Sequence, residues 1–181
     1  MPTPVVALVS VVLALVVAAS VAYAARALWR RQVRRYLIGL VGSREDVRSQ
    51  ARALESVVEI LAGAGDSTLV AFAQNPRTEE RRTLADIAQR MTITAEELRT
   101  AALPKRLWTA ANLLEAAARA VAGEAGKAGD APTPSAALDA LAAVDLTAPE
   151  GVALRASEEL HRLCVEYGVE DPAVYGGGLY I

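Results

Sequence analysis

The sequence is poor in the residues from which most active sites are built. Its 181 residues include one cysteine, one histidine and two lysines. A single cysteine excludes an intramolecular disulfide and leaves no cysteine cluster for structural zinc. The sequence also has no P-loop, no dinucleotide-binding fingerprint and no Gly-x-Ser-x-Gly motif. We therefore expect a non-enzymatic protein that holds neither a cofactor nor a metal.

The pair closest to a reactive site is His161 and Cys164, which lie three residues apart beside Glu158. A catalytic Cys/His pair needs a third group to orient the base and an oxyanion site, and a metal would need two further ligands. The sequence offers neither set. We predict instead that Cys164 packs in the core with Leu160 and that His161 lies at the core's edge.

Aromatic residues are also scarce, at 4%, while 53% of the residues are hydrophobic. Abundant alanine and few large side chains predict an all-α fold of closely packed helices. The charge is distributed unevenly along the chain. The formal net charge is -2, and setting aside the five arginines between residues 26 and 35 leaves -2 - 5 = -7 for the rest.

The segment before those arginines, residues 4–25, carries no charged side chain. As a helix that rises ~1.5 Å per residue it spans roughly 33 Å, enough to cross a hydrocarbon core of ~30 Å. A buried helix of this length that is apolar on every face would be unusual in a small domain. We therefore predict a single transmembrane anchor over residues 1–25.

The arginines also predict the orientation of this anchor. No Lys or Arg precedes it and five Arg follow within ten residues, so the positive-inside rule puts the N-terminus outside the cell membrane and the C-terminal domain in the cytoplasm. We interpret residues 26–41 as a basic, amphipathic juxtamembrane segment. The side chains predicted to bind lipid headgroups are Trp29, Arg30, Arg31, Arg34 and Arg35.

A cleavable signal peptide is the alternative to an anchor, because Ala22-Tyr23-Ala24 matches the pattern of a cleavage site. The segment has no positive n-region, and its apolar run is longer than the usual ~7–15 residues. Arginines directly after the site would also have to be exported. The anchor is therefore the favoured interpretation, and cleavage would instead give a secreted protein.

The cytoplasmic part reads as a multi-helix bundle with a flexible C-terminal tail. Gly42 and Ser43 predict a break, with Ser43 as an N-cap. The expected parts are a helical bundle over 43–122, a Gly- and Pro-rich linker or loop over 123–134, C-terminal helices over 135–168 and a tail over 169–181. Thr78 is an expected N-cap, Thr147 and Glu150 form a capping box, and Gly168 is a natural stop.

Apolar residues in the first cytoplasmic helix step by four and three positions, at Val47, Ala51, Leu54, Val58 and Leu61. This seam covers just over two heptads, so packing within the bundle is favoured over an extended coiled coil. A homodimer is the alternative, because the anchor also has small residues at Ala14, Ala18 and Ala22, a spacing that lets two transmembrane helices pack closely.

The end of the tail carries a second candidate surface for a protein partner. Three glycines precede the apolar residues Leu179, Tyr180 and Ile181. An apolar C-terminus of this kind can be bound by strand addition. Folding back on the bundle and disorder are the alternatives.

Residues 83–103, TLADIAQRMTITAEELRTAAL, resemble the helix-turn-helix of bacterial DNA-binding regulators. The two helices and the turn would be carried by Ile87, Ala88, Met91, Ile93 and Leu98. The resemblance implies DNA binding by a membrane-tethered regulator. However, Glu96 and Glu97 would face the phosphates, which disfavours nucleic acid. Thr94 and Glu97 also form a capping box, which begins helices of any kind.

Together these features favour a membrane-anchored helical interaction or scaffold protein that acts at the cytoplasmic face. Its expected partners are membrane lipids and an unknown protein. The helix-turn-helix regulator is the alternative from another class.

Overall fold

The computed structural model describes residues 4–170, with side chains from residue 12 onward. Within these limits the chain forms α-helices, one short 3-10 helix and no strand, which confirms the all-α prediction. The elements are α1 (Pro4–Ala62), α2 (Asp66–Gln74), α3 (Glu79–Thr100), η1 (Lys105–Leu107), α4 (Trp108–Gly129), α5 (Pro134–Ala142) and α6 (Thr147–Tyr167).

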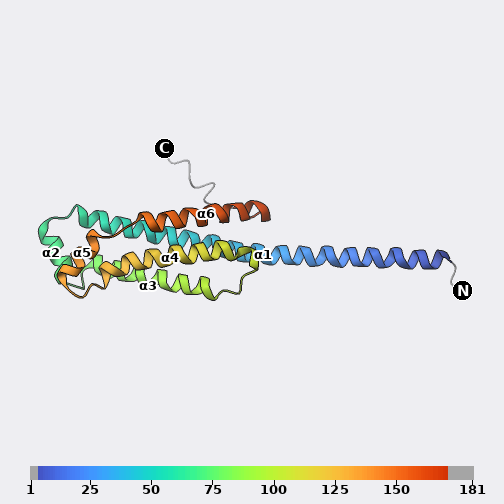
Figure 1. The fold of residues 1–181 in the computed structure, drawn as a ribbon, viewed down its shortest axis with the longest axis horizontal. Helices are drawn as coiled ribbons and strands as arrows, with labels where there is room; N and C mark the ends of the chain where they lie inside the picture. The colour runs from blue at the N-terminus through green and yellow to red at the C-terminus, as the bar shows by residue number, and fades with distance from the viewer. Residues whose placement is uncertain (1–3, 171–181) are drawn as a thin grey trace, which may run out of the picture.

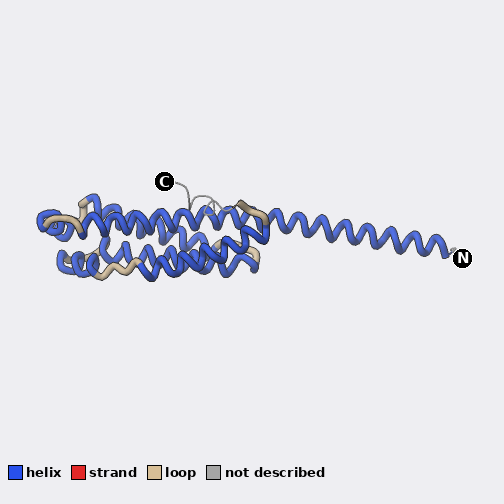
Figure 2. The backbone as a smooth tube through the Cα atoms, turned by 90° about the horizontal axis from the view of Figure 1, so that it is seen from above, coloured by secondary structure: helices blue, strands red, loops and turns tan. Residues whose placement is uncertain are grey.

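Four of the helices form a bundle, and one of them continues far beyond it. Figure 1 shows part of α1 alongside α3, α4 and α6, with α2 and α5 at the distal end of the bundle. At the opposite end, which we call the proximal end, α1 leaves the bundle and projects alone toward the N-terminus. The same arrangement is seen from above in Figure 2.

Helix α1 is unbroken from the apolar segment into the core. Its large apolar side chains are exposed from Val12, at 53%, to Leu28, at 65%, whereas Val33 and Leu37 are fully buried. The predicted break at Gly42 is wrong. Burial of Val41 and Arg44 on either side holds the helix together against the cost of a helical glycine, about 1 kcal/mol. The predicted N-cap Ser43 instead donates to the carbonyl of Gly39 at 3.2 Å.

The apolar seam of α1 packs inside the bundle, as favoured. Val47, Leu54 and Leu61 are buried in one core cluster with Phe72 and Leu84, and the partly buried Ala51 and Val58 pack against it. A second cluster, nearer the proximal end, joins residues of α1, α4 and α6, including Leu37, Leu107 and Leu160. The juxtamembrane segment therefore joins the bundle from Val33 onward.

The helix-turn-helix prediction is wrong, because α3 is a single helix through residues 79–100. Met91, Thr94 and Leu98 are buried along it, so Thr94 is not a cap and no turn separates two helices. The helix begins where expected, since the Thr78 hydroxyl accepts from the backbone N–H of Arg81 at 3.4 Å.

The prediction of a linker over 123–134 is also wrong for most of that range, because α4 continues to Gly129. Ala125 and Ala128 are fully buried, and a Cβ at Gly129 would lie 3.1 Å from the backbone N of Ala85. Close contact with α3 thus outweighs the poor helix propensity of the glycines.

A buried arginine completes that end of α4. Arg81, 4% exposed, donates from Nε and Nη2 to the carbonyl of Gly129 at 3.1 and 2.9 Å, and to that of Ala131 at 2.7 Å. Its guanidinium also lies 5.8 Å from the centroid of the Phe72 ring. A cation here satisfies carbonyls at the negative end of the helix dipole.

The start of α6 differs from the sequence prediction, whereas its end agrees with it. The Thr147–Glu150 capping box is absent. The carboxylate of Asp145 instead accepts from the Thr147 hydroxyl at 2.6 Å and its N–H at 2.9 Å, and these bonds lower the pKa of Asp145. The predicted stop is confirmed, with Gly168 in the left-handed conformation at φ 61°.

Candidate functional site

The projecting part of α1 is long and apolar enough to cross a membrane. None of its most apolar window is buried in the bundle. Val17, Val21 and Tyr23 are 55%, 63% and 78% exposed. Because exposed apolar surface of this extent is unfavourable in water, this part of α1 is compatible with a membrane-spanning helix.

The predicted headgroup residues occupy the point where α1 enters the bundle, and two of them also make contacts within the protein. Arg30, Arg31 and Arg35 are exposed. Arg34 donates from Nη2 to the carbonyl of Gly168, at the C-terminal end of α6.

Trp29 is the second of these residues with a partner. Its ring meets that of Tyr167 edge to face, with the ring centroids 6.2 Å apart. The guanidinium of Arg106 lies 5.7 Å from the centroid of the same Trp29 ring. Trp29 therefore joins α1 to α6 and to η1, a role that its sequence neighbours did not predict.

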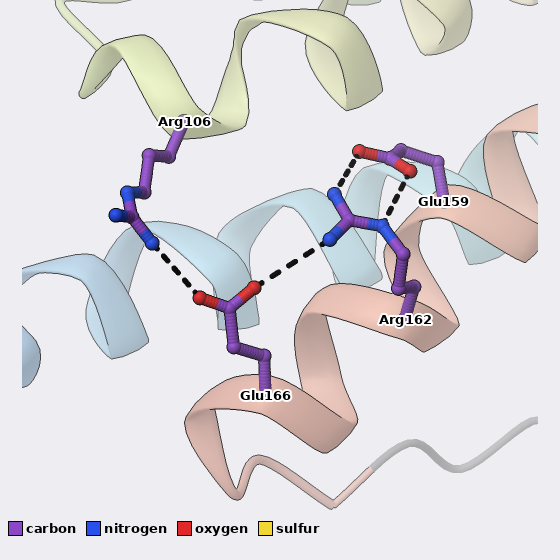
Figure 3. Close-up of polar contacts among 4 residues, drawn as sticks. All are labelled: Arg106, Glu159, Arg162 and Glu166. Carbon is purple, nitrogen blue, oxygen red and sulfur yellow. Dashed lines mark hydrogen bonds and ion pairs between the residues drawn. The ribbon is translucent and has the colours of Figure 1, made fainter.

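Ion pairs extend this contact along α6, as Figure 3 shows. Arg106 Nη1 lies 3.0 Å from Glu166 Oε1, and Glu166 Oε2 lies 3.5 Å from Arg162 Nη1. Arg162 in turn donates to both carboxylate oxygens of Glu159, at 2.9 and 2.6 Å. The hydrogen bonds from Arg162 lower the pKa of Glu159 despite its partial desolvation.

A groove of about 640 Å³ lies between α1, α4 and the N-terminal half of α6. Its apolar lining includes Val47, Leu54, Leu114, Val121, Leu146 and Leu154. Leu154 is 61% exposed at the groove. The size and lining suit the apolar face of a bound segment.

Arginines of α1 give this groove a basic wall. Arg44, Arg48 and Arg52, spaced by four residues, all line it. The guanidinium of Arg44 is buried and pairs with Glu45 at 2.9 Å. Within the described part of the chain, Arg48 and Arg52 form no ion pair. Glu55 and Glu150 also line the groove and offset part of this positive charge. The groove was not predicted from the sequence, although Arg44, Arg48 and Arg52 recur every four residues beside the apolar seam of α1.

The other candidate pair lies on α6. Cys164 is buried in the same core cluster as Leu160, as predicted, while His161 is exposed on the same helix. Among residues 4–170, no group of three or more His, Cys, Asp or Glu side chains is placed to hold a metal. The proposed tail residues Leu179, Tyr180 and Ile181 lie outside the described residues.

Comparison with known proteins adds no relative. No protein-family model, curated protein or solved structure matches this chain.

Proposed function

We propose that this protein is a single-pass, non-enzymatic interaction protein of the cell membrane, with its N-terminus outside and its helical bundle in the cytoplasm. The observation that carries the proposal is the continuity of α1. One helix is exposed and apolar over its N-terminal part and buried in the bundle from Val33 onward. The anchor and the bundle are thus joined without a linker.

The orientation follows from the charge at the junction. Arg26, Arg30, Arg31, Arg34 and Arg35 border the apolar part on the bundle side, whereas residues 1–3 on its other side carry no Lys or Arg. This asymmetry favours retention of the bundle in the cytoplasm.

The groove supplies the surface for a protein partner. Its apolar lining and the unpaired Arg48 and Arg52 suit an amphipathic helix that places carboxylates opposite these two arginines and away from Glu55 and Glu150, which also line the groove. A rigid connection to the anchor would hold such a partner close to the membrane.

The anchor is tested by expressing the full chain with a C-terminal tag and separating membranes by alkaline extraction. We expect a full-length protein in the membrane fraction, with a tag that protease reaches only after the cells are opened. A soluble, exported chain shortened after Ala24 would contradict the anchor and support signal cleavage instead.

The groove is tested by replacing Leu154 with a photo-crosslinking amino acid in cells. We expect a discrete crosslinked product that is lost when Arg48→Glu and Arg52→Glu are combined. The same crosslinker at Val165, an exposed α6 position away from the groove, is the control. A product that survives the charge reversal, or no product, would contradict docking in the groove.

A further inference from the structure

The proximal end of the bundle carries an aromatic and basic surface beyond the arginines of α1. Trp108 is 52% exposed, and its indole N–H donates to the carbonyl of Leu103 at 2.9 Å. The Nζ of Lys105 lies 6.0 Å from the centroid of the Trp108 ring. The ring therefore has its polar atom satisfied within the protein while much of its apolar surface stays open.

Contacts within the bundle hold this surface level with Trp29 of α1. Arg106, which follows Lys105 in η1, stacks on Trp29, and Tyr167 at the end of α6 packs on the same Trp29 ring. Trp29 lies four residues beyond Ala25, or about 6 Å along a helix. The headgroup layer on each side of a bilayer is about 5–8 Å thick.

From this geometry we infer that η1 and the start of α4 form a second binding site for anionic lipid headgroups, made by Lys105, Arg106 and Trp108. The inference rests on the proposed anchor, because the span of α1 sets the position of the membrane. Once α1 crosses the bilayer, its unbroken helix brings the proximal end of the bundle to the headgroups. A cation and an exposed indole are the side chains that favour this layer.

The charge of the proximal end fits the same ligand. Lys105 and Arg106 add to the exposed Arg30, Arg31 and Arg35 of α1. Glu166 pairs with Arg106 and offsets part of this charge, but Lys105 forms no ion pair within the described residues. Both tryptophans of the chain, Trp29 and Trp108, lie at this end.

The two tryptophans make the inference directly measurable in the full chain. Trp29→Phe keeps an aromatic ring for the contacts with Tyr167 and Arg106 and leaves Trp108 as the single reporter, and Trp108→Phe leaves Trp29; both variants are used only if their helical content equals that of the unmodified chain. Each variant is reconstituted into vesicles of phosphatidylcholine, alone or in an equal mixture with phosphatidylglycerol. A fraction of the phosphatidylcholine carries a nitroxide on its headgroup, which quenches nearby indoles. Val70→Trp, combined with Trp29→Phe and Trp108→Phe, places a control reporter on the exposed surface of α2 at the distal end.

We expect Trp108 to be quenched, more strongly in the anionic vesicles, and the Val70→Trp reporter to stay bright. The chain's two lysines give a matched test of charge. Lys105→Gln should lose the extra quenching of Trp108 in anionic vesicles, and Lys127→Gln should keep it. High salt should also reduce the additional quenching of Trp108 in anionic vesicles, because salt screens exposed charges.

The outcomes separate the inference from the proposed anchor. If Trp29 is quenched and Trp108 is not, the anchor stands and the second headgroup site is overturned. If Trp108 is quenched equally in both vesicles, the specificity for anionic lipid is overturned. If neither tryptophan is quenched, the anchor fails, and the headgroup site fails with it.

Discussion

The ring of Tyr167, at the C-terminal end of α6, packs edge to face on the ring of Trp29, with 6.2 Å between centroids and 62° between planes. This contact closes the proximal end of the bundle where α1 leaves it. The residue that the sequence places at the membrane boundary is therefore also part of the tertiary structure. Changes at Trp29 or Tyr167 should affect folding as well as membrane contact.

Tyr167→Phe should stabilise the protein. The hydroxyl of Tyr167 is buried and has no hydrogen-bond partner among the described residues. An unsatisfied buried polar group costs about 1–3 kcal/mol, and Phe keeps the ring that packs on Trp29. The free energy of unfolding, measured by denaturant titration in detergent micelles, should rise by about 1 kcal/mol. Tyr23→Phe, on the exposed part of α1, is the control, and a loss of stability in Tyr167→Phe would show that the hydroxyl has a partner.

Arg81→Ala should be strongly destabilising. It removes three hydrogen bonds to the carbonyls of Gly129 and Ala131 and leaves those acceptors partly buried. We expect a loss of about 2–4 kcal/mol in the free energy of unfolding. Arg82→Ala, at the exposed neighbouring position, should change it by less than about 0.5 kcal/mol. Equal effects of the two variants would contradict the capping role of Arg81.

Two glycines of α4 should respond to alanine in opposite directions. At Gly123 a Cβ would meet nothing within 4 Å, so Gly123→Ala should stabilise the helix by about 1 kcal/mol. At Gly129 the Cβ would lie 3.1 Å from Ala85 N and 3.3 Å from Leu84 Cβ, so Gly129→Ala must push α3 away. We expect a loss of about 1–3 kcal/mol, read from the same denaturant titrations. Stabilisation by both substitutions would mean that α3 and α4 do not approach so closely.

Stability should decrease in acid partly through Glu159. Its hydrogen bonds from Arg162 lower its pKa in the folded protein below the ordinary value of 4.5. A lowered folded pKa gives a contribution that is present above the unfolded pKa and is lost as the pH falls through the folded pKa. Arg162 is largely exposed, so water screens the pair and its contribution should stay below about 1 kcal/mol.

The measurement for Glu159 is the free energy of unfolding at neutral pH and at a pH below the folded pKa. Glu159→Gln should show a smaller difference between the two conditions than the unmodified protein does. Arg162→Gln should reduce the difference in the same way, because it removes the donor. An undiminished difference in both variants would rule out this pair as a source of the acid sensitivity.

The sequence predicted the features that depend on local pattern and composition. The all-α class, the seam from Val47 to Leu61, the cap at Thr78 and the stop at Gly168 are all seen in the structure. Each depends on helical spacing or on the backbone preference of a single residue. Both can be recognised in the local sequence without knowing which residues are in contact in the folded protein.

The errors lie where tertiary packing overrides local preference. Gly42 and the glycines of 123–129 looked like breaks, but burial of residues beside them keeps α1 and α4 helical. The turn expected near Ile93 is absent because Met91, Thr94 and Leu98 all pack along one helix. Arg81 and Trp29 could not be assigned at all, since their partners lie in segments far away in the sequence. The groove between α1 and α6 was missed for the same reason.

The measurement that tests the central claim most directly is the accessibility of single cysteines on either side of the anchor. Cys164→Ala removes the one native thiol, and Thr3→Cys or Ser56→Cys then adds one before the apolar segment 4–25 or within the bundle. A membrane-impermeant maleimide should label Thr3→Cys in intact cells and Ser56→Cys only after lysis. Labelling of Ser56→Cys in intact cells, or loss of Thr3→Cys from the mature chain, would contradict a single-pass anchor with a cytoplasmic bundle.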